Sequence, residues 1–176
     1  FAEGLARVAG ELIQLTWREE LAYRWPLEGF SHLDEPLATH RYPGEGWGLC
    51  NLDEELVMSN GSSELVIRDA TSFAERRRVD VTLDGAPLDR LNELECIDDR
   101  VWANIWYDNR IVRIDPRTGR VDAWIDLRAV IDANTRETLS QDAVLNGIAW
   151  RPETETLLVT GKLWPEIIEI RLTNLP

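Results

Sequence analysis

Histidine and cysteine are both scarce in this chain of 176 residues, which has two of each. His32 and His40 cannot supply a site with three histidine ligands, and Cys50 and Cys96 cannot build a zinc ribbon. Both of these metal-centre types are therefore excluded. The two cysteines permit at most one disulfide, and the sequence alone leaves its formation open.

Long apolar runs and positive charge are lacking as well. No apolar run approaches the ~20 residues that a membrane-spanning helix needs. Nineteen Lys and Arg residues stand against 32 Asp and Glu residues, which gives a net charge of −13. Nucleic acids and anionic membranes select for basic patches, so we expect neither as a partner. The content of 44% hydrophobic and 29% charged residues is typical of a folded globular chain.

Proline- and serine-rich linkers are absent, and short apolar runs instead alternate with turn-like clusters along the whole chain. A turn signal about every 8–12 residues is the pattern of an all-β protein. Only Leu127–Thr135 indicates a helical turn. We predict strands at Leu12–Trp17, Glu55–Ser59, Glu64–Arg68, Arg77–Thr82, Arg100–Ile105, Ile111–Ile114, Val121–Ile125, Thr156–Thr160 and Ile167–Leu172.

The strand pattern itself repeats. Four short segments, which we call openers, each begin a module: Glu3–Leu5, Gly46–Leu49, Asn92–Glu95 and Asn146–Ala149. Their first residues are 43, 46 and 54 positions apart, and an apolar strand ending in polar or aromatic residues follows each. A module of ~40–50 residues with about four strands is typical of a β-propeller blade. We therefore predict a β-propeller with about four blades; the alternative is a β-sandwich, whose sequence has no need to repeat.

The ends of the chain add an expectation about its extent. The last module stops after its third strand, near Leu172, and this leaves an open sheet edge that propellers normally avoid by closure. The chain starts at Phe1 without a signal region. We expect residues 1–176 to be a single propeller domain that is incomplete, with the closing strand supplied by residues before Phe1.

Equivalent positions in the modules predict a shared site. The innermost strands of a propeller surround a central channel, and their ends form a pocket at one mouth. The polar and aromatic residues of openers and strand ends should converge there, although a tryptophan more often packs and Lys162 could pair with Glu166. Trp25, Trp124 and Trp150 are expected to pack within ordinary strands. The converging set is Glu3, Trp17, Trp47, Asn92, Trp106 and Lys162.

Several motifs together resemble a known family. They are Phe1–Leu5, Gln14–Trp17, Tyr42–Leu49, Leu91–Glu95, Ala103–Trp106, Asn109–Pro116, Leu145–Ala149 and Val159–Pro165. In this order they are similar to the glutaminyl cyclotransferases of the plant and bacterial type, over essentially the whole chain. The resemblance implies a five-bladed propeller that converts N-terminal glutamine of a peptide or protein to pyroglutamate and releases ammonia. It also implies that no metal or cofactor takes part, and it suggests a secreted or periplasmic protein.

The resemblance implies roles for individual residues. Glu3 would be the general acid and base, while Trp17, Trp47 and Trp106 would form an aromatic wall. Phe1 would line the same pocket, and Asn92 and Lys162 would be polar contacts. The motif of the family's first blade is missing, so the chain corresponds to the last four of five blades.

Two other functions stay open at this point. One is a non-catalytic propeller that binds a partner or serves as a scaffold. The other is a propeller hydrolase, which would usually need a second catalytic carboxylate. Glu45, Glu93 and Glu95 are the candidates for that carboxylate.

Overall fold

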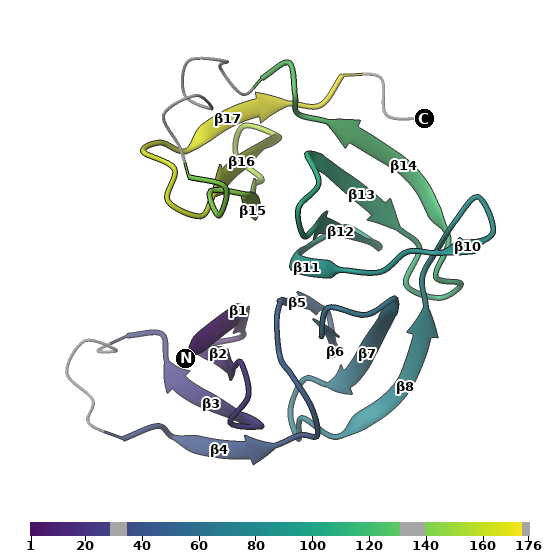
Figure 1. Cartoon of the computed structure of the whole chain (residues 1–176). Helices are drawn as coiled ribbons and strands as arrows, with labels where there is room; N and C mark the ends of the chain where they lie inside the picture. Colours follow the sequence, from purple (N-terminus) through teal and green to yellow (C-terminus); the bar gives the residue numbers. More distant parts are fainter. Residues whose placement is uncertain (29–34, 131–139, 174–176) are drawn as a thin grey trace.

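The computed structural model describes residues 1–28, 35–130 and 140–173, and Figure 1 shows them as blades that follow one another around an arc. Four antiparallel sheets form the blades; three have four strands and the last has three. Strand order within each blade follows the sequence, so neighbouring strands are joined as a meander. The prediction of an all-β propeller with about four blades is confirmed. Within the described residues, no helix is long and apolar enough to cross a membrane.

The strand bounds follow the module pattern. The first blade has β1 (Ala2–Val8), β2 (Glu11–Thr16), β3 (Leu21–Pro26) and β4 (Ala38–Arg41). The second has β5 (Leu49–Leu52), β6 (Glu55–Ser59), β7 (Glu64–Asp69) and β8 (Glu75–Asp80). The third has β11 (Leu91–Ile97), β12 (Arg100–Ile105), β13 (Arg110–Ile114) and β14 (Val121–Asp126), and the fourth has β15 (Leu145–Arg151), β16 (Thr156–Gly161) and β17 (Ile168–Arg171). A two-stranded hairpin, β9 (Thr82–Leu83) with β10 (Ala86–Pro87), lies between the second and third blades.

The openers are themselves the innermost strands or lead directly into them. β1, β5, β11 and β15 surround the centre of the arc in Figure 1, and neighbours along this series are in contact. Our strand predictions missed these four strands, together with β3, β4 and β10. Gly, Asn or Glu residues in the four innermost strands interrupt the apolar alternation by which a half-buried strand is recognised. The part of the predicted helical turn that the structure describes, 127–130, is a turn closed by the Val130 N–H and the Leu127 carbonyl, and 131–135 lie outside the described residues.

A β-bulge explains why openers are irregular. The pairing register shifts between Ala2 and Leu5 in β1, between Leu91 and Leu94 in β11, and between Leu145 and Ile148 in β15. A bulge leaves residues unpaired and bends the strand, which allows their side chains to be re-aimed. Three of the four openers therefore present their polar residues at an interruption of the ladder.

Hydrophobic side chains are buried between neighbouring blades. Three apolar clusters each join two consecutive blades, and Val57, Leu65, Leu91 and Val101 belong to the cluster between the second and third. A disulfide between Cys50 and Cys96, whose Cα atoms are 5.4 Å apart, crosses this same junction from β5 to β11. Apolar burial between the blades thus holds the innermost strands, and with them the openers, at fixed positions.

Candidate active site

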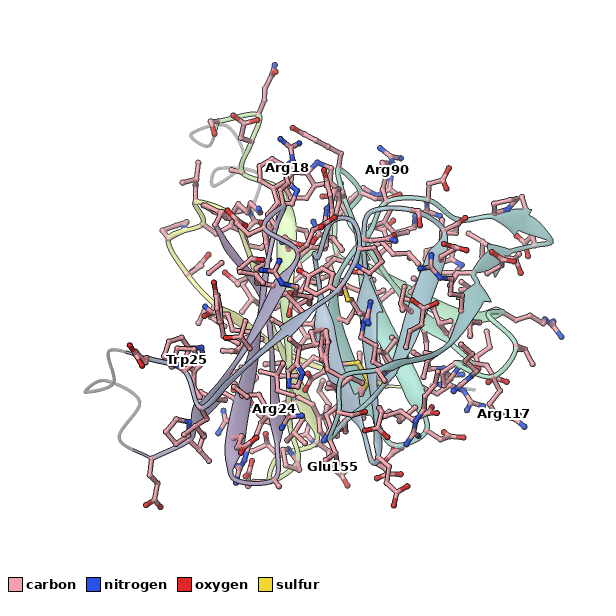
Figure 2. All side chains as sticks on the ribbon, turned by 90° about the horizontal axis from the view of Figure 1, so that it is seen from below. Arg18, Arg24, Trp25, Arg90, Arg117 and Glu155 are labelled. Carbon is pink, nitrogen blue, oxygen red and sulfur yellow. A yellow bond between two sulfur atoms is a disulfide. The ribbon has the colours of Figure 1, made fainter. Side chains whose placement is uncertain are left out.

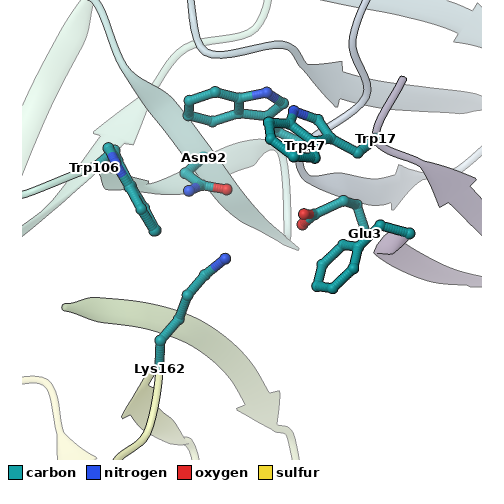
Figure 3. Close-up of a pocket in the computed structure, with 7 residues that line it drawn as sticks. Glu3, Trp17, Trp47, Asn92, Trp106 and Lys162 are labelled. Atoms are coloured by element: carbon teal, nitrogen blue, oxygen red, sulfur yellow. The ribbon is translucent and has the colours of Figure 1, made fainter. Parts of the chain in front are cut away.

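A pocket of about 280 Å³ opens at one mouth of the central channel, between the ends of the innermost strands. Figure 2 shows Arg18 and Arg90 at one face of the molecule and Arg117 and Glu155 at the other, and the pocket lies at the face of Arg18. Seven residues line it, and they are all of the residues that the sequence assigned to a site: Phe1, Glu3, Trp17, Trp47, Asn92, Trp106 and Lys162. Figure 3 shows six of them with their side chains directed toward a common space. The structure thus brings the whole set together, and the roles of its members remain predictions.

Each lining residue comes from an opener or a strand end. Glu3 and Asn92 lie at the bulges of β1 and β11, and Trp47 precedes β5 by two residues. Trp17 and Trp106 each follow the second strand of a blade, after Thr16 and Ile105. Lys162 follows Gly161, the last residue of β16. The four blades contribute to one pocket because the repeat places these positions at the same mouth.

Close backbone approach between openers depends on glycine. A Cβ atom at Gly4 would lie 2.6 Å from the Leu49 nitrogen, and one at Gly48 would clash with the Asn92 carbonyl oxygen. Hydrogen bonds cross the same contacts: the Gly4 N–H donates to the Trp47 carbonyl at 2.7 Å. Ser59 Oγ accepts from the Gly48 N–H and donates to the Asn92 carbonyl. Only glycine leaves space for these contacts, which hold Glu3, Trp47 and Asn92 close together.

The Glu3 carboxyl is electrostatically distinct from a surface glutamate. Burial raises its pKa, and the ammonium of Lys162 and the amino terminus oppose that rise. In Figure 3 the Lys162 ammonium enters the pocket from the side opposite the Glu3 backbone. The amino group of Phe1 is held by Glu19 Oε1 at 2.9 Å. A carboxyl whose pKa is raised by burial is better suited to accept and return a proton than a surface glutamate is.

Aromatic rings form one side of the pocket. Trp47 and Trp106 meet edge to face, with ring centroids 6.2 Å apart. The Lys162 Nζ atom lies 4.7 Å from the Trp106 ring centroid, which is a cation–π distance. Lys162 is also the only lysine in the sequence, and this rarity is a further signal that could have drawn attention to it.

Sequence reasoning missed the part that Glu45 plays. One oxygen of this carboxylate, Oε2, accepts hydrogen bonds from Trp17 Nε1 at 2.8 Å and from Trp47 Nε1 at 2.9 Å. The other, Oε1, accepts from Arg18 Nε at 3.1 Å. Hydrogen bonds from the two indoles lower the pKa of Glu45, so it stays charged over a wide pH range. A glutamate between two glycines beside Trp47 carries no pattern that predicts such a contact.

Two more glutamates lie on β11 beside the site. Burial, together with the charges of Glu95 and Glu3, raises the pKa of Glu93 to about 8. Burial also raises the pKa of Glu95, whose Oε1 accepts from the Trp150 N–H at 2.9 Å. Glu93 stands where the other openers have Gly4, Gly48 and Gly147. Neither glutamate is among the residues that line the pocket.

One expectation about the tryptophans is wrong. Trp124 lies on the outermost strand β14 and is 54% exposed, with the Arg110 guanidinium 6.0 Å from its ring centroid. Trp150 packs against the apolar cluster of the last two blades, and Trp25 Nε1 donates to Gln14 Oε1. Outward positions of an outer strand alternate like inward ones, so the pattern alone does not distinguish them.

Ligands for a metal ion do not gather in the part of the chain that the structure describes. No group of three or more His, Cys, Asp or Glu side chains there is arranged to hold one. Whether the reaction proceeds without a metal or cofactor remains a prediction.

The fold and the pocket define a β-propeller whose site is formed by the ends of its innermost strands. Residues 1–172 match the family model for glutamine cyclotransferase, and the chain belongs to this family. The glutaminyl-peptide cyclotransferase of Arabidopsis thaliana is 34% identical over 172 residues, which is 98% of this chain and 53% of the relative. The chain thus spans about half the length of that relative.

Solved structures agree with this assignment. The crystal structure of Myxococcus xanthus glutaminyl cyclase superposes with a TM-score of 0.90 at 40% identity, and the match covers 100% of this chain and 74% of that one. The β-propeller domain of Cps50 (Swd1) from Myceliophteria thermophila has a TM-score of 0.62 at 13% identity, over 99% of this chain and 52% of that one. The second likeness concerns the fold alone.

Proposed function

We propose that this chain carries the catalytic pocket of a glutaminyl-peptide cyclotransferase, which converts an N-terminal glutamine to pyroglutamate and releases ammonia. The observation that carries the proposal is the meeting of one carboxyl, one ammonium, one amide and three indoles in a pocket of about 280 Å³. Membership of the glutamine cyclotransferase family supports the reaction class. The substrate is a peptide or protein that begins with glutamine.

The reaction requires two things of the protein: it must hold the glutamine side chain in a bent conformation, and it must transfer protons. The α-amino nitrogen attacks the side-chain amide carbon, and a five-membered ring closes as the new C–N bond forms. The bond to the original amide nitrogen then breaks, and that nitrogen leaves as ammonia. Because both reacting groups belong to one residue, the protein has mainly to select the reactive side-chain rotamer.

Glu3 is the proton carrier in this proposal. The attacking amine loses a proton as the new bond forms, and the leaving nitrogen gains one. A single carboxyl between the two nitrogens can accept the first proton and donate it to the second, for about 10²–10⁴-fold in rate. Burial, which raises the pKa of Glu3, brings it closer to neutral pH, where both directions of transfer are efficient.

The remaining pocket residues bind the glutamine side chain and stabilise charge on its carbonyl oxygen. The faces of Trp17, Trp47 and Trp106 would pack against the methylene groups of the glutamine and exclude water. Lys162 or the Asn92 amide would stabilise negative charge on the former carbonyl oxygen, a contribution of about 3 kcal/mol when well aimed. Asn92 is 4% exposed, so its amide orientation is set by its surroundings rather than by solvent.

A direct test is Glu3→Gln in the full-length protein. The substitution keeps size and hydrogen bonding but removes the titratable group, so we expect kcat for a glutamine-initiated peptide to fall at least about 100-fold with binding nearly unchanged. Ammonia release is measured at a series of peptide concentrations and pH values for wild type and variant, and it gives kcat and KM for each. Near wild-type kcat in the variant would exclude Glu3 as the acid and base.

The same assay separates the two other functions. A non-catalytic propeller would release no ammonia from a glutamine-initiated peptide, with or without Glu3. A hydrolase would act on sugar or lactone substrates through a second carboxylate. Of the candidates for that carboxylate, Glu45 is already bound to two indoles and a guanidinium, and Glu93 and Glu95 do not line the pocket.

A further inference from the structure

The two tryptophans on one side of the pocket are joined by a single carboxylate. Trp17 follows β2 of the first blade and Trp47 precedes β5 of the second, yet both indole N–H groups donate to Glu45 Oε2. In Figure 3 the nitrogen atoms of the two indoles lie next to each other, and they are turned away from the Glu3 carboxylate. Hydrogen bonds to a charged acceptor are roughly twice as strong as neutral ones.

The carboxylate is itself held in place by its surroundings. Arg18 Nε donates to Glu45 Oε1, and the guanidinium of Arg18 lies 3.8 Å from the Trp17 ring centroid. Arg18 thus contacts both the carboxylate and one of the indoles that this carboxylate binds. Glu45 is 37% exposed on its side chain, so it lies at the rim and not inside the pocket.

The backbone around Glu45 is fixed on both sides. The Gly46 N–H donates to the Trp17 carbonyl at 3.0 Å, and a Cβ atom at Gly46 would clash with the Tyr42 hydroxyl. The Gly44 N–H donates to Glu20 Oε1 at 2.9 Å. The segment that connects the first two blades therefore presents Glu45 at a defined position above both indoles.

We propose that Glu45 is a positioning residue, which orients the indoles of Trp17 and Trp47 so that their ring faces line the glutamine pocket. This inference rests on the proposed function, because it concerns the wall against which the glutamine side chain folds. Each indole has one N–H donor, and Glu45 uses both of them. These two indoles then offer the substrate apolar ring surface, and their N–H donors do not compete for the glutamine carbonyl oxygen. Without Glu45 each indole loses the hydrogen bond that fixes the direction of its N–H edge.

Two variants at position 45 separate the effect of side-chain length from the effect of side-chain charge. Glu45→Gln keeps an acceptor oxygen at the same distance but has no charge, whereas Glu45→Asp keeps the charge but shortens the reach by one methylene group. Glu45→Ala removes both. Glu153→Ala is the control, since Glu153 is an exposed glutamate in the turn between β15 and β16.

The first measurement does not depend on activity. The eight tryptophans give eight indole N–H signals in a ¹H–¹⁵N NMR spectrum, and Trp17→Phe and Trp47→Phe assign the two of interest. In Glu45→Ala and Glu45→Asp we expect these two signals to move together and to exchange faster with water. Glu45→Gln, whose neutral oxygen is a weaker acceptor, should move both signals less than Glu45→Ala does, and Glu153→Ala should leave both in place. Unchanged signals in Glu45→Ala would overturn the proposal.

The second measurement is the KM for a glutamine-initiated peptide in the full-length protein. We expect Glu45→Ala to raise KM at least about fivefold, with Glu45→Gln within about twofold of wild type. Partial unfolding would instead lower kcat and leave KM unchanged. An unchanged KM in Glu45→Ala, or an equal rise in Glu45→Gln and Glu45→Ala, would overturn the positioning role.

The two measurements also distinguish this inference from the proposed function. If the wild type releases no ammonia, the proposed function fails, and the affinity for the same peptide, followed by tryptophan fluorescence, takes the place of KM. Weaker binding in Glu45→Ala would then still support the positioning role, and unchanged binding would overturn it.

Discussion

The junction between the second and third blades is more extensively apolar than the junction between the third and fourth. At the first, a disulfide joins β5 to β11, and thirteen buried residues form one apolar cluster. At the second, the apolar cluster has eight buried residues, and polar groups cross from β11 and β12 to β15: Asn104 Oδ1 accepts from the Gly147 N–H, and Glu95 Oε1 accepts from the Trp150 N–H. The buried Nδ2 atom of Asn104 has no hydrogen-bond partner there.

Each junction supports a different part of the pocket. The apolar junction places Trp47 beside Asn92, which are fixed groups of the wall and floor. The polar junction places the Lys162 ammonium over the Trp106 ring, and β11 on its third-blade side carries Glu93, a carboxyl with a pKa of about 8. The difference teaches that rigid placement and electrostatic tuning of this pocket come from separate interfaces, which substitutions can therefore change separately.

Removal of the disulfide should have the largest effect on stability. Cys50 and Cys96 are separated by 46 positions, and a cross-link of this kind typically contributes about 2–4 kcal/mol by restricting the unfolded chain. We expect the double variant Cys50→Ser/Cys96→Ser to lose about this free energy of unfolding in a denaturant titration. Wild type treated with reductant is the control and should match it; a loss below about 1 kcal/mol would show that the apolar cluster alone holds the junction.

Gly61 tests how tightly Trp47 is held on the same side. A Cβ atom at Gly61 would lie 2.6 Å from the Trp47 ring, and its φ is +82°. We expect Gly61→Ala to cost about 1–3 kcal/mol of stability and to raise KM, because the ring must move. Gly85→Ala is the matched control: φ is +83° there, but nothing lies within 4 Å of the added atom. If Gly61→Ala and Gly85→Ala lower the thermal unfolding midpoint equally, backbone strain alone explains the loss of stability in Gly61→Ala.

Glu93 tests the polar junction through pH. Its pKa is about 8 in the folded protein and 4.5 ordinarily, so between these values the folded state keeps a proton that the unfolded state releases. Stability from this group is therefore present below about pH 4.5 and is lost as pH rises to about 8. We expect Glu93→Gln to be more stable than wild type at pH 8 by at least about 1 kcal/mol, with a smaller difference at pH 5.

The measurement is the thermal unfolding midpoint of both proteins across that range. Glu153→Gln, a change at an exposed glutamate, should leave the pH dependence as it is in wild type. Parallel curves for wild type and Glu93→Gln would show that the polar junction does not hold a protonated carboxyl.

The influence of Lys162 on the pKa of Glu3 should be the smallest of the four effects, since the ammonium acts on that carboxyl through charge alone. Its ammonium lowers the pKa of Glu3, so removing that charge should raise this pKa further. We expect Lys162→Met to move the acidic limb of the pH–rate profile upward by less than about one pH unit. Lys162→Arg, which keeps the charge, should leave the limb in place. If the acidic limb shifts equally in Lys162→Met and Lys162→Arg, the contact of Lys162 with Trp106, and not its charge, sets the pKa of Glu3.

Some strands of this chain were predicted from the residue pattern and others were not. The strands Glu55–Ser59 and Arg100–Ile105 were predicted with their observed bounds, because both are short apolar runs between clear turns. β1 and β15 were missed as strands, although their openers were recognised as repeated units. Residues at a bulge do not alternate in the way that a paired strand does, so periodicity does not detect them.

The sequence by itself determined the blade repeat, the family and the candidate site residues, because equivalent positions in a repeat occupy equivalent places in space. Only the tertiary structure decided that Cys50 pairs with Cys96, that Glu45 holds two indoles from different blades and that Glu93 lies half-buried near Glu95 and Glu3. These three features depend on distances between side chains of different blades. Such distances arise from the packing of sheet against sheet, which no local pattern of residues encodes.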